Sequence, residues 1–348
     1  MRVRTREIIA KVLLLTISLA ISLVFAEVLI RWVVPQELTP LAAWDSTGLT
    51  IYDPELGHAL RPNFEGPWVG NVVVKVNSIG LRDREYPAKR KNEIRILSLG
   101  DSYAFGYGVE LSESYPKVLE KMLSARFPQC DFSVVNGAVS GYSTYQEILV
   151  LQKLYGLLHP DFVLATFVGS NDVTENAVIV EQLQQKVQTP VGFLGHHSHL
   201  VRLVLRTIYP ITNRASNWWG PNISHTIELL RELEKQLRTK NLPYTFLVIP
   251  ARHQIRPEVN LASEWVVRLG LYDFIIRHNT AIIRHFEIDR IPYIDLLPLL
   301  REHDKLERVS LEDSHTNPVG HRVIAEAVNK WIEPKIAELA RKKQCLSQ

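Results

Sequence analysis

The sequence predicts a doubly wound α/β fold, in which helices cover both faces of a five-stranded parallel sheet to give three α/β/α layers. The first observation is that short apolar runs alternate with helical stretches from residue 94 to residue 342. The second is that Pro116 and Pro318 each fall in the first turn of a predicted helix, where proline is favoured. The predicted strands are 94–99, 132–135, 162–167, 244–249 and 291–294, and the predicted helices are 115–127, 144–157, 222–239, 264–287 and 318–342.

The first 35 residues differ from the rest of the chain. Four basic residues open it: Arg2, Arg4, Arg6 and Lys11. A stretch without any charge follows from residue 12 to 26, and apolar character resumes at 28–30 after Glu27. A bilayer span needs about 20 apolar residues, and basic residues favour the cytoplasmic side. We therefore expect a single membrane anchor over residues 8–30, with a cytoplasmic N-terminus and an extracytoplasmic or periplasmic catalytic domain.

Two other interpretations of this segment stay open. Residues 24–26 end in Ala26, an acceptable site for cleavage of a signal peptide. The segment could also be a buried core helix, although it lacks a polar face. The anchor and the signal peptide both place the chain after about residue 35 outside the cytoplasm.

Composition narrows the classes of partner. The net charge of +3 is close to neutral for 348 residues, and the basic residues are scattered, so nucleic acid is not an expected partner. We interpret the run 89–91 as solvated surface. Cys130 and Cys345 are too few for a disulfide framework and lack metal spacing. Whether these two cysteines pair stays open. Protein partners cannot be identified from the sequence.

The predicted domain organisation has three parts. Residues 1–35 are the anchor or signal peptide, 36–93 a linker with a small β lead-in that includes a strand at 71–77, and 94–342 the main domain. Residues 173–221 interrupt the alternation of strands and helices, and we expect a lid-like insertion with a short helix at 199–208. We interpret its histidines as surface residues rather than metal ligands, and its tryptophans as packing residues: His196, His197, His199, Trp218 and Trp219.

The strongest chemical signal is Gly100-Asp101-Ser102, directly after the predicted strand 94–99. Ligands of parallel α/β sheets bind outside the carboxyl ends of strands, where a nucleophile belongs. Three further polar blocks follow later strands in order, at 136–141, 169–172 and 312–321. Acyl transfer needs a hydroxyl nucleophile, an imidazole base, an orienting carboxylate and N–H donors for the oxyanion. The four blocks contain all of these groups.

These four blocks resemble those of the SGNH (GDSL) hydrolases, in the family's order, from about residue 94 to residue 330. The resemblance implies a flavodoxin-like plan, with Ser102 as nucleophile and His315 as base. It also implies an oxyanion hole made by the N–H groups of Ser102 and Gly141 and the side chain of Asn171. Residues 81–87, read with the N-terminal span, resemble envelope-anchored members found with polysaccharide modification systems.

The third member of the triad stays open between two residues. The family's usual block is Asp-x-x-His, but here Glu312 stands three residues before His315 and Asp313 two before it. Residues two apart in an extended segment point the same way, which favours Asp313, whereas a tight turn would favour Glu312. We take Asp313 as the orienting acid.

The sequence thus predicts a serine esterase that hydrolyses small acyl esters through an acyl-Ser102 intermediate, without a metal or an organic cofactor. By resemblance, the substrate is an O-acetyl group on an envelope or exported carbohydrate. Two alternatives are kept: a carbohydrate O-acetyltransferase that uses the same site, and a catalytically silent membrane scaffold.

Overall fold

The computed structural model describes most of the chain. The described residues are 2–33, 47–169, 171–173, 175–176, 198–201, 223–250, 252–256, 273–311 and 315–345. Two compact units are present. The smaller one consists of Met1–Trp44 and Gln185–Gly220, and the larger one of Asp45–Gln184 and Pro221–Gln348.

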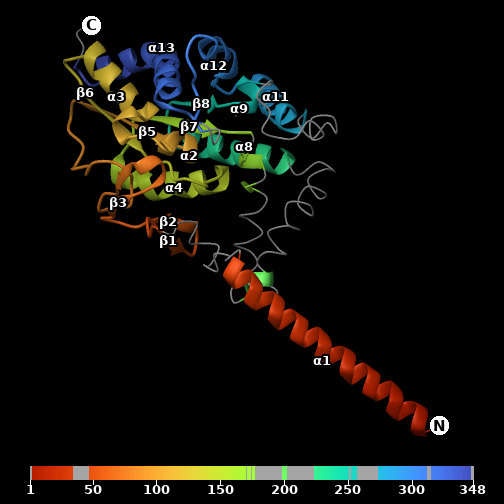
Figure 1. Ribbon diagram of the computed structural model, residues 1–348. Coiled ribbons are helices and arrows are strands. Elements are labelled where there is room, and N and C mark those ends of the chain that lie inside the picture. Colours follow the sequence, from red (N-terminus) through yellow and green to blue (C-terminus); the bar gives the residue numbers. More distant parts are fainter. Residues whose placement is uncertain are drawn as a thin grey trace. The chain divides into compact units, whose positions relative to one another are not determined.

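A five-stranded parallel sheet forms the centre of the larger unit (Figure 1). Its strands lie in the order β6 (Asp131–Asn136), β5 (Glu93–Leu99), β7 (Phe162–Phe167), β8 (Tyr244–Val248) and β9 (Tyr293–Asp295). Every residue of β5 and β7 is buried, as expected for strands covered on both faces. This strand order is the flavodoxin-like one, so the predicted fold class is confirmed.

Helices cover both faces of this sheet. On one face lie α3 (Tyr115–Arg126) and α13 (Pro318–Lys342), which contact each other. On the other lie α4 (Thr144–Leu158) and α8 (Ile223–Thr239), and α8 in turn contacts α11 (Asp273–Ile288). The apolar faces of the helices and the sheet form one continuous core. The region 264–272 of the predicted fourth helix lies outside the described residues.

Several short elements were not predicted. They are β1 (Thr50–Asp53), β2 (Gly57–Leu60), β3 (Glu65–Pro67), η1 (Val69–Asn71), α2 (Ser102–Phe105), η2 (Leu111–Glu113), α9 (Arg252–Ile255) and α12 (Leu297–Asp304). The predicted strand 71–77 is reduced to β4 (Val73–Lys75), which pairs with β3, while β1 pairs with β2. These strands were not predicted for two reasons. Each is too short to show an alternation of apolar and polar residues, and the surrounding sequence is rich in Pro and Gly. The last strand also begins at Tyr293 rather than at 291, since the Ile291 N–H turns back to Phe286 of α11.

The smaller unit contains α1 (Arg2–Val33). Its segment Ile9–Val33 has a mean hydropathy of 2.5 and is, by length and composition, long and apolar enough to cross a membrane. The Glu27 carboxylate near its end accepts hydrogen bonds from the hydroxyl of Ser198 and from the N–H groups of His199 and Leu200. Residues 199–201 are helical, so Glu27 caps the start of this helical turn. Of the predicted lid, 173, 175–176 and 198–201 are among the described residues, whereas His196, His197, Trp218 and Trp219 lie outside them.

Cys130 and Cys345 form a disulfide, with their Cα atoms 5.2 Å apart. The bond ties the residue before β6 to the chain just beyond α13. The question that the sequence left open is therefore answered by the fold, which brings together two residues 215 positions apart.

Candidate active site

Ser102 is the first residue of α2, in the turn that leaves β5. Gly100 in this turn has a φ of +154°, and a Cβ there would lie 2.7 Å from the Cβ of Ala104 and 2.8 Å from that of Thr166. Only glycine fits such a close approach. Asp101 caps α2, because its carboxylate accepts a hydrogen bond of 2.9 Å from the Tyr103 N–H. The turn thus fixes Ser102 at the carboxyl end of β5.

His315 reaches the same edge from the loop before α13. Its carbonyl accepts a hydrogen bond of 2.7 Å from the Leu311 N–H, and Ser310 and Thr316 form a β-bridge beside it. Asn317 caps α13 by accepting from the Gly320 N–H and also donates to the Arg308 carbonyl. These bonds hold His315 at the start of the helix.

The structure brings Ser102 and His315 into direct contact. The distance between Ser102 Oγ and His315 Nε2 is 2.9 Å, a good hydrogen bond of the kind that a serine nucleophile makes with its base. Ser102 is only 6% exposed, so the pair is largely shielded from bulk water. The two predicted alternatives for the orienting acid, Asp313 and Glu312, lie outside the described residues, and the assignment stays a prediction.

The predicted oxyanion residues come from the two neighbouring strand ends. Gly141 follows β6 and has a φ of +80°. Its loop is tied to the nucleophile turn by a hydrogen bond from the Val139 N–H to the Gly100 carbonyl. Asn171 follows β7, and its Nδ2 donates a hydrogen bond of 2.6 Å to the Asp101 carboxylate. Both residues are therefore linked to the turn that carries Ser102.

The β1–β2 hairpin supports the Gly141 loop. His58 Nε2 lies 3.0 Å from the Ser140 carbonyl, and the Tyr142 hydroxyl donates to the His58 carbonyl. Burial lowers the pKa of His58, so its ring is neutral at neutral pH. The β1–β2 hairpin thus helps to hold the predicted oxyanion loop.

Four buried or partly buried carboxyl groups interact electrostatically behind this edge: Asp101, Glu147, Asp172 and Glu175. Burial raises the pKa of Glu147 and of Asp172 well above their usual range and that of Glu175 to about 8, and the Asp101 charge adds to each shift. Burial also raises the pKa of Asp101, but the bonds from Asn171 and the Tyr103 N–H oppose this. These shifts favour the protonated, neutral forms of Glu147, Asp172 and Glu175 beside Asp101.

Arg82 and Asp83 support the site, and sequence reasoning gave them no role of their own. Arg82 is fully buried and donates to the carbonyls of Phe105 and Gly106 at the end of α2, and to that of Val109 just beyond it. Asp83 accepts from the Asn136 N–H at the end of β6. Both residues belong to segment 81–87, which already resembled the envelope-anchored members of the family. That resemblance was the feature of the sequence that could have pointed to their role.

His321 lies apart from the reacting pair. It is buried in α13, its Nδ1 accepts a hydrogen bond from the Tyr115 N–H, and burial lowers its pKa to about 3. Within the described ranges no group of three or more acidic, histidine or cysteine side chains could hold a metal ion.

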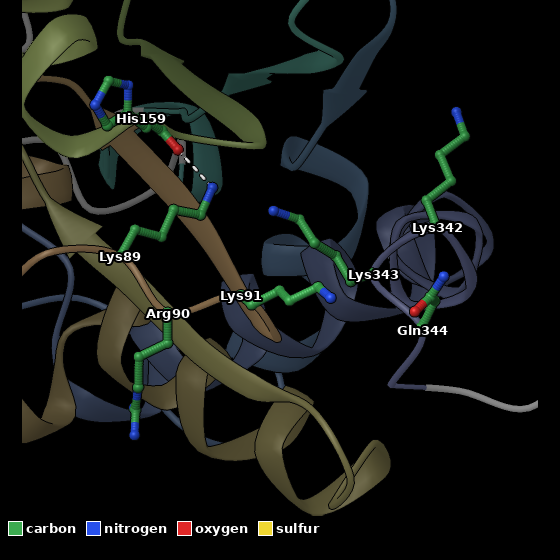
Figure 2. A pocket seen from close by; sticks show the side chains of 7 residues that line it. All are labelled: Lys89, Arg90, Lys91, His159, Lys342, Lys343 and Gln344. Carbon is green, nitrogen blue, oxygen red and sulfur yellow. Dashed lines mark hydrogen bonds between the residues drawn. The ribbon is translucent and has the colours of Figure 1, made fainter.

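A basic pocket lies at the opposite, amino-terminal edge of the sheet (Figure 2). It is lined by Lys89, Arg90, Lys91, His159, Lys342, Lys343 and Gln344. Lys89 and Lys343 both pair with Asp161, at 2.6 and 3.1 Å, and Arg90 lies 3.5 Å from Asp131. The pocket is remote from Ser102, since these residues precede the strands or follow the last helix.

A serine hydrogen-bonded to a histidine at the carboxyl edge of a doubly wound sheet defines the class of serine hydrolases. The chain belongs to the GDSL-like lipase/acylhydrolase family, whose model matches residues 98–323. The family expected from the sequence and its enzyme class, that of serine carboxylic ester hydrolases, are therefore confirmed.

Individual relatives are more distant. An arylesterase of Vibrio mimicus is 35% identical over 78 residues, which are 22% of this chain and 38% of that protein. A lipase/acylhydrolase from Enterococcus faecalis is similar in structure, with a TM-score of 0.45 and 15% identity, over 70% of this chain and 96% of that one. The esterase EstA from Pseudoalteromonas sp. has a TM-score of 0.43 and 15% identity, over 70% and 98%. Likenesses of this size say nothing about the substrate.

Proposed function

We propose that the protein is a membrane-anchored serine esterase that hydrolyses small acyl esters, with O-acetyl groups on envelope or exported carbohydrate as the substrate class. The observation that carries the proposal is the 2.9 Å contact between Ser102 Oγ and His315 Nε2 at the carboxyl edge of the sheet. A catalytically silent scaffold would not need this pair in a shielded site with glycine and amide groups beside it.

The proposed reaction has two halves. Ser102 Oγ attacks the acyl carbon while its proton passes to His315 Nε2, and the carbonyl oxygen becomes an oxyanion. The N–H groups of Ser102 and Gly141 and the Nδ2 of Asn171 stabilise this oxyanion, and loss of one such donor costs about 2.7–4 kcal/mol. His315 then gives the proton to the leaving alcohol, which leaves an acyl-Ser102 ester. A water molecule, deprotonated by His315, releases the acid and restores Ser102.

The carbohydrate O-acetyl substrate rests on the resemblance of residues 81–87 and the N-terminal span to envelope-anchored members of the family. Transfer to a sugar hydroxyl begins with the same acyl-Ser102 ester and differs only in the group that attacks it. Transfer requires an acceptor held about 3–3.5 Å from the acyl carbon. We favour hydrolysis, because it needs no second binding site.

The proposed location is extracytoplasmic, with the N-terminus in the cytoplasm. The apolar segment Ile9–Val33 follows a basic N-terminus, which favours the cytoplasmic side. The Cys130–Cys345 disulfide supports the same location, since disulfides persist in oxidising compartments.

A fluorophosphonate probe tests the activity, because it labels only an activated serine. Full-length protein in detergent should be labelled, and Ser102→Ala should abolish both labelling and the hydrolysis of 4-nitrophenyl acetate. Ser112→Ala, at an exposed serine of η2, is the matched control and should behave like wild type. A wild-type protein that is folded but neither labelled nor active would support the scaffold instead.

A second assay separates hydrolysis from transfer. The enzyme is given an acetyl ester with and without an oligosaccharide acceptor, and the products are separated by mass. Free acetate at an unchanged rate supports hydrolysis, whereas acetylated oligosaccharide as the main product would favour the transferase.

A further inference from the structure

The ring of Tyr107 lies flat against the imidazole of His315. The two ring centroids are 3.9 Å apart and the planes differ by 17°. On another side Tyr107 meets the ring of Trp68, with centroids 4.8 Å apart and an interplanar angle of 72°. Tyr107 is thus held between the histidine of the reacting pair and an aromatic residue of the lead-in.

The turn that presents Ser102 also positions Tyr107. The Tyr107 N–H donates a hydrogen bond of 3.0 Å to the Ser102 carbonyl. Gly106 between them has a φ of +83°, and a Cβ there would lie 2.9 Å from the Cβ of Ser114. Arg82 holds the Gly106 carbonyl at 2.7 Å. The nucleophile and the Tyr107 ring are therefore parts of one rigid turn, and His315 lies between its two functional side chains.

We propose that Tyr107 is a positioning residue that acts through His315 by stabilising its protonated form during acyl transfer. The proposal rests on the esterase function proposed above. When Oγ of Ser102 bonds to the acyl carbon, its proton moves to Nε2 and the neutral imidazole becomes a cation. The face of an aromatic ring carries partial negative charge and attracts a cation within about 6 Å of its centroid. Tyr107 therefore stabilises the state that follows proton transfer more than the state before it.

The stack also restricts the imidazole. A ring held flat against Tyr107 cannot tilt without losing this contact, so Nε2 remains in line with Oγ at 2.9 Å. General-base catalysis requires the base to lie within hydrogen-bond distance of the proton that it removes. A tilted imidazole would therefore lower the rate of acyl transfer.

Other titratable groups near His315 are shared by all the variants below. Among the described residues they are Tyr103, whose ring centroid is 5.2 Å away, and Asp101 and His321, which both interact electrostatically with His315. A difference in kcat/KM or in the pH profile between variants at position 107 therefore reports the effect of the Tyr107 side chain alone.

The test is the pH dependence of kcat/KM for 4-nitrophenyl acetate with full-length protein in detergent. Tyr107→Phe keeps the ring and should stay within about twofold of wild type. Tyr107→Leu should lower kcat/KM about 2- to 30-fold, the range that cation–π strengths imply. Since the stack favours the protonated imidazole, its loss should also move the ascending limb of the profile to lower pH. Trp68→Leu removes the ring that holds Tyr107 on its other side, so it should move the limb in the same direction but by less than Tyr107→Leu does.

A series of fluorinated phenylalanines at position 107 tests the proposal independently, in case Tyr107→Leu fails to fold. Phenylalanine with one, two or three ring fluorines at position 107 keeps the shape while the negative face weakens. The logarithm of kcat/KM should fall steadily with fluorine number, and the limb should move with it. A flat series, or an equal limb shift in Trp68→Leu, overturns the proposal. Inactive wild-type protein would instead count against the esterase function itself.

Discussion

The side-chain amide of Asn171 donates a hydrogen bond of 2.6 Å to the carboxylate of Asp101, the residue directly before Ser102. This contact joins the loop after β7 to the nucleophile turn after β5. An amide nitrogen carries two hydrogens, and the Asn171 side chain also interacts with the Glu175 carboxyl. A charged acceptor strengthens such a bond. Asp101 therefore orients the proposed oxyanion donor as well as capping α2.

Asp101→Asn should lower kcat/KM about 10- to 100-fold, because hydrogen bonds to charged groups are worth about 1.5–3 kcal/mol. Asparagine is also a good cap, so the variant should fold, which circular dichroism can check. Asp172→Asn is the matched control. Burial raises the pKa of Asp172 well above its usual range, so asparagine replaces a carboxyl whose neutral form is already favoured. Near wild-type activity is expected there, and equal losses in both variants would contradict the role given to Asp101.

Glu175 should make the fold less stable as the pH rises. Its pKa in the folded protein is about 8, above the value of about 4.3 for an unfolded glutamate. The stability that the protonated group contributes is complete below pH 4.3 and is lost towards pH 8, by at most about 1.4 kcal/mol per pH unit. Glu175→Gln should therefore raise the thermal midpoint at pH 8 and have little effect at pH 4. An exposed glutamate of α8, Glu228, provides the control: Glu228→Gln should leave the pH dependence unchanged, and the same gain there would contradict the prediction.

The orienting acid can be identified by turnover. Asp313→Asn should reduce kcat by as much as 10⁴-fold, the loss seen when the orienting acid of a comparable triad is neutralised. Glu312→Gln should retain most of the activity. Both variants are compared with Ser102→Ala after their folding has been confirmed. A collapse in Glu312→Gln with Asp313→Asn nearly unaffected would reverse the assignment.

The N-terminal helix should remain on the mature protein. We expect an N-terminus at or near Met1 and retention in the membrane fraction after a carbonate wash. Glu27 makes three hydrogen bonds to residues 198–200, at 2.7–2.9 Å, and Glu27→Ala should increase proteolytic cleavage there without releasing the protein from the membrane. Glu7→Ala, at an exposed position of α1, should change neither. Soluble protein that begins at Glu27 would show that the segment is a cleaved signal peptide.

Sequence alone determined the fold class and predicted which serine and histidine would meet. Buried strands such as β5 and β7 are apolar throughout and alternate with helices, a local pattern that does not depend on the rest of the chain. The carboxyl ends of parallel strands share one edge, so polar blocks after successive strands had to meet there. That rule brought Ser102 and His315 to one site although 213 residues separate them.

Tertiary structure decided what depends on distance between remote side chains. Nothing in the neighbourhood of Cys130 or Cys345 signals a partner, because a disulfide requires a separation that only the packing of α13 and β6 against α3 sets. Likewise, nothing in the sequence distinguishes Tyr107 from other turn residues. Only the tertiary structure shows that its ring centroid lies 3.9 Å from that of His315. Local periodicity encodes which faces are buried, whereas contacts between loops are set by the packing of the elements that carry them.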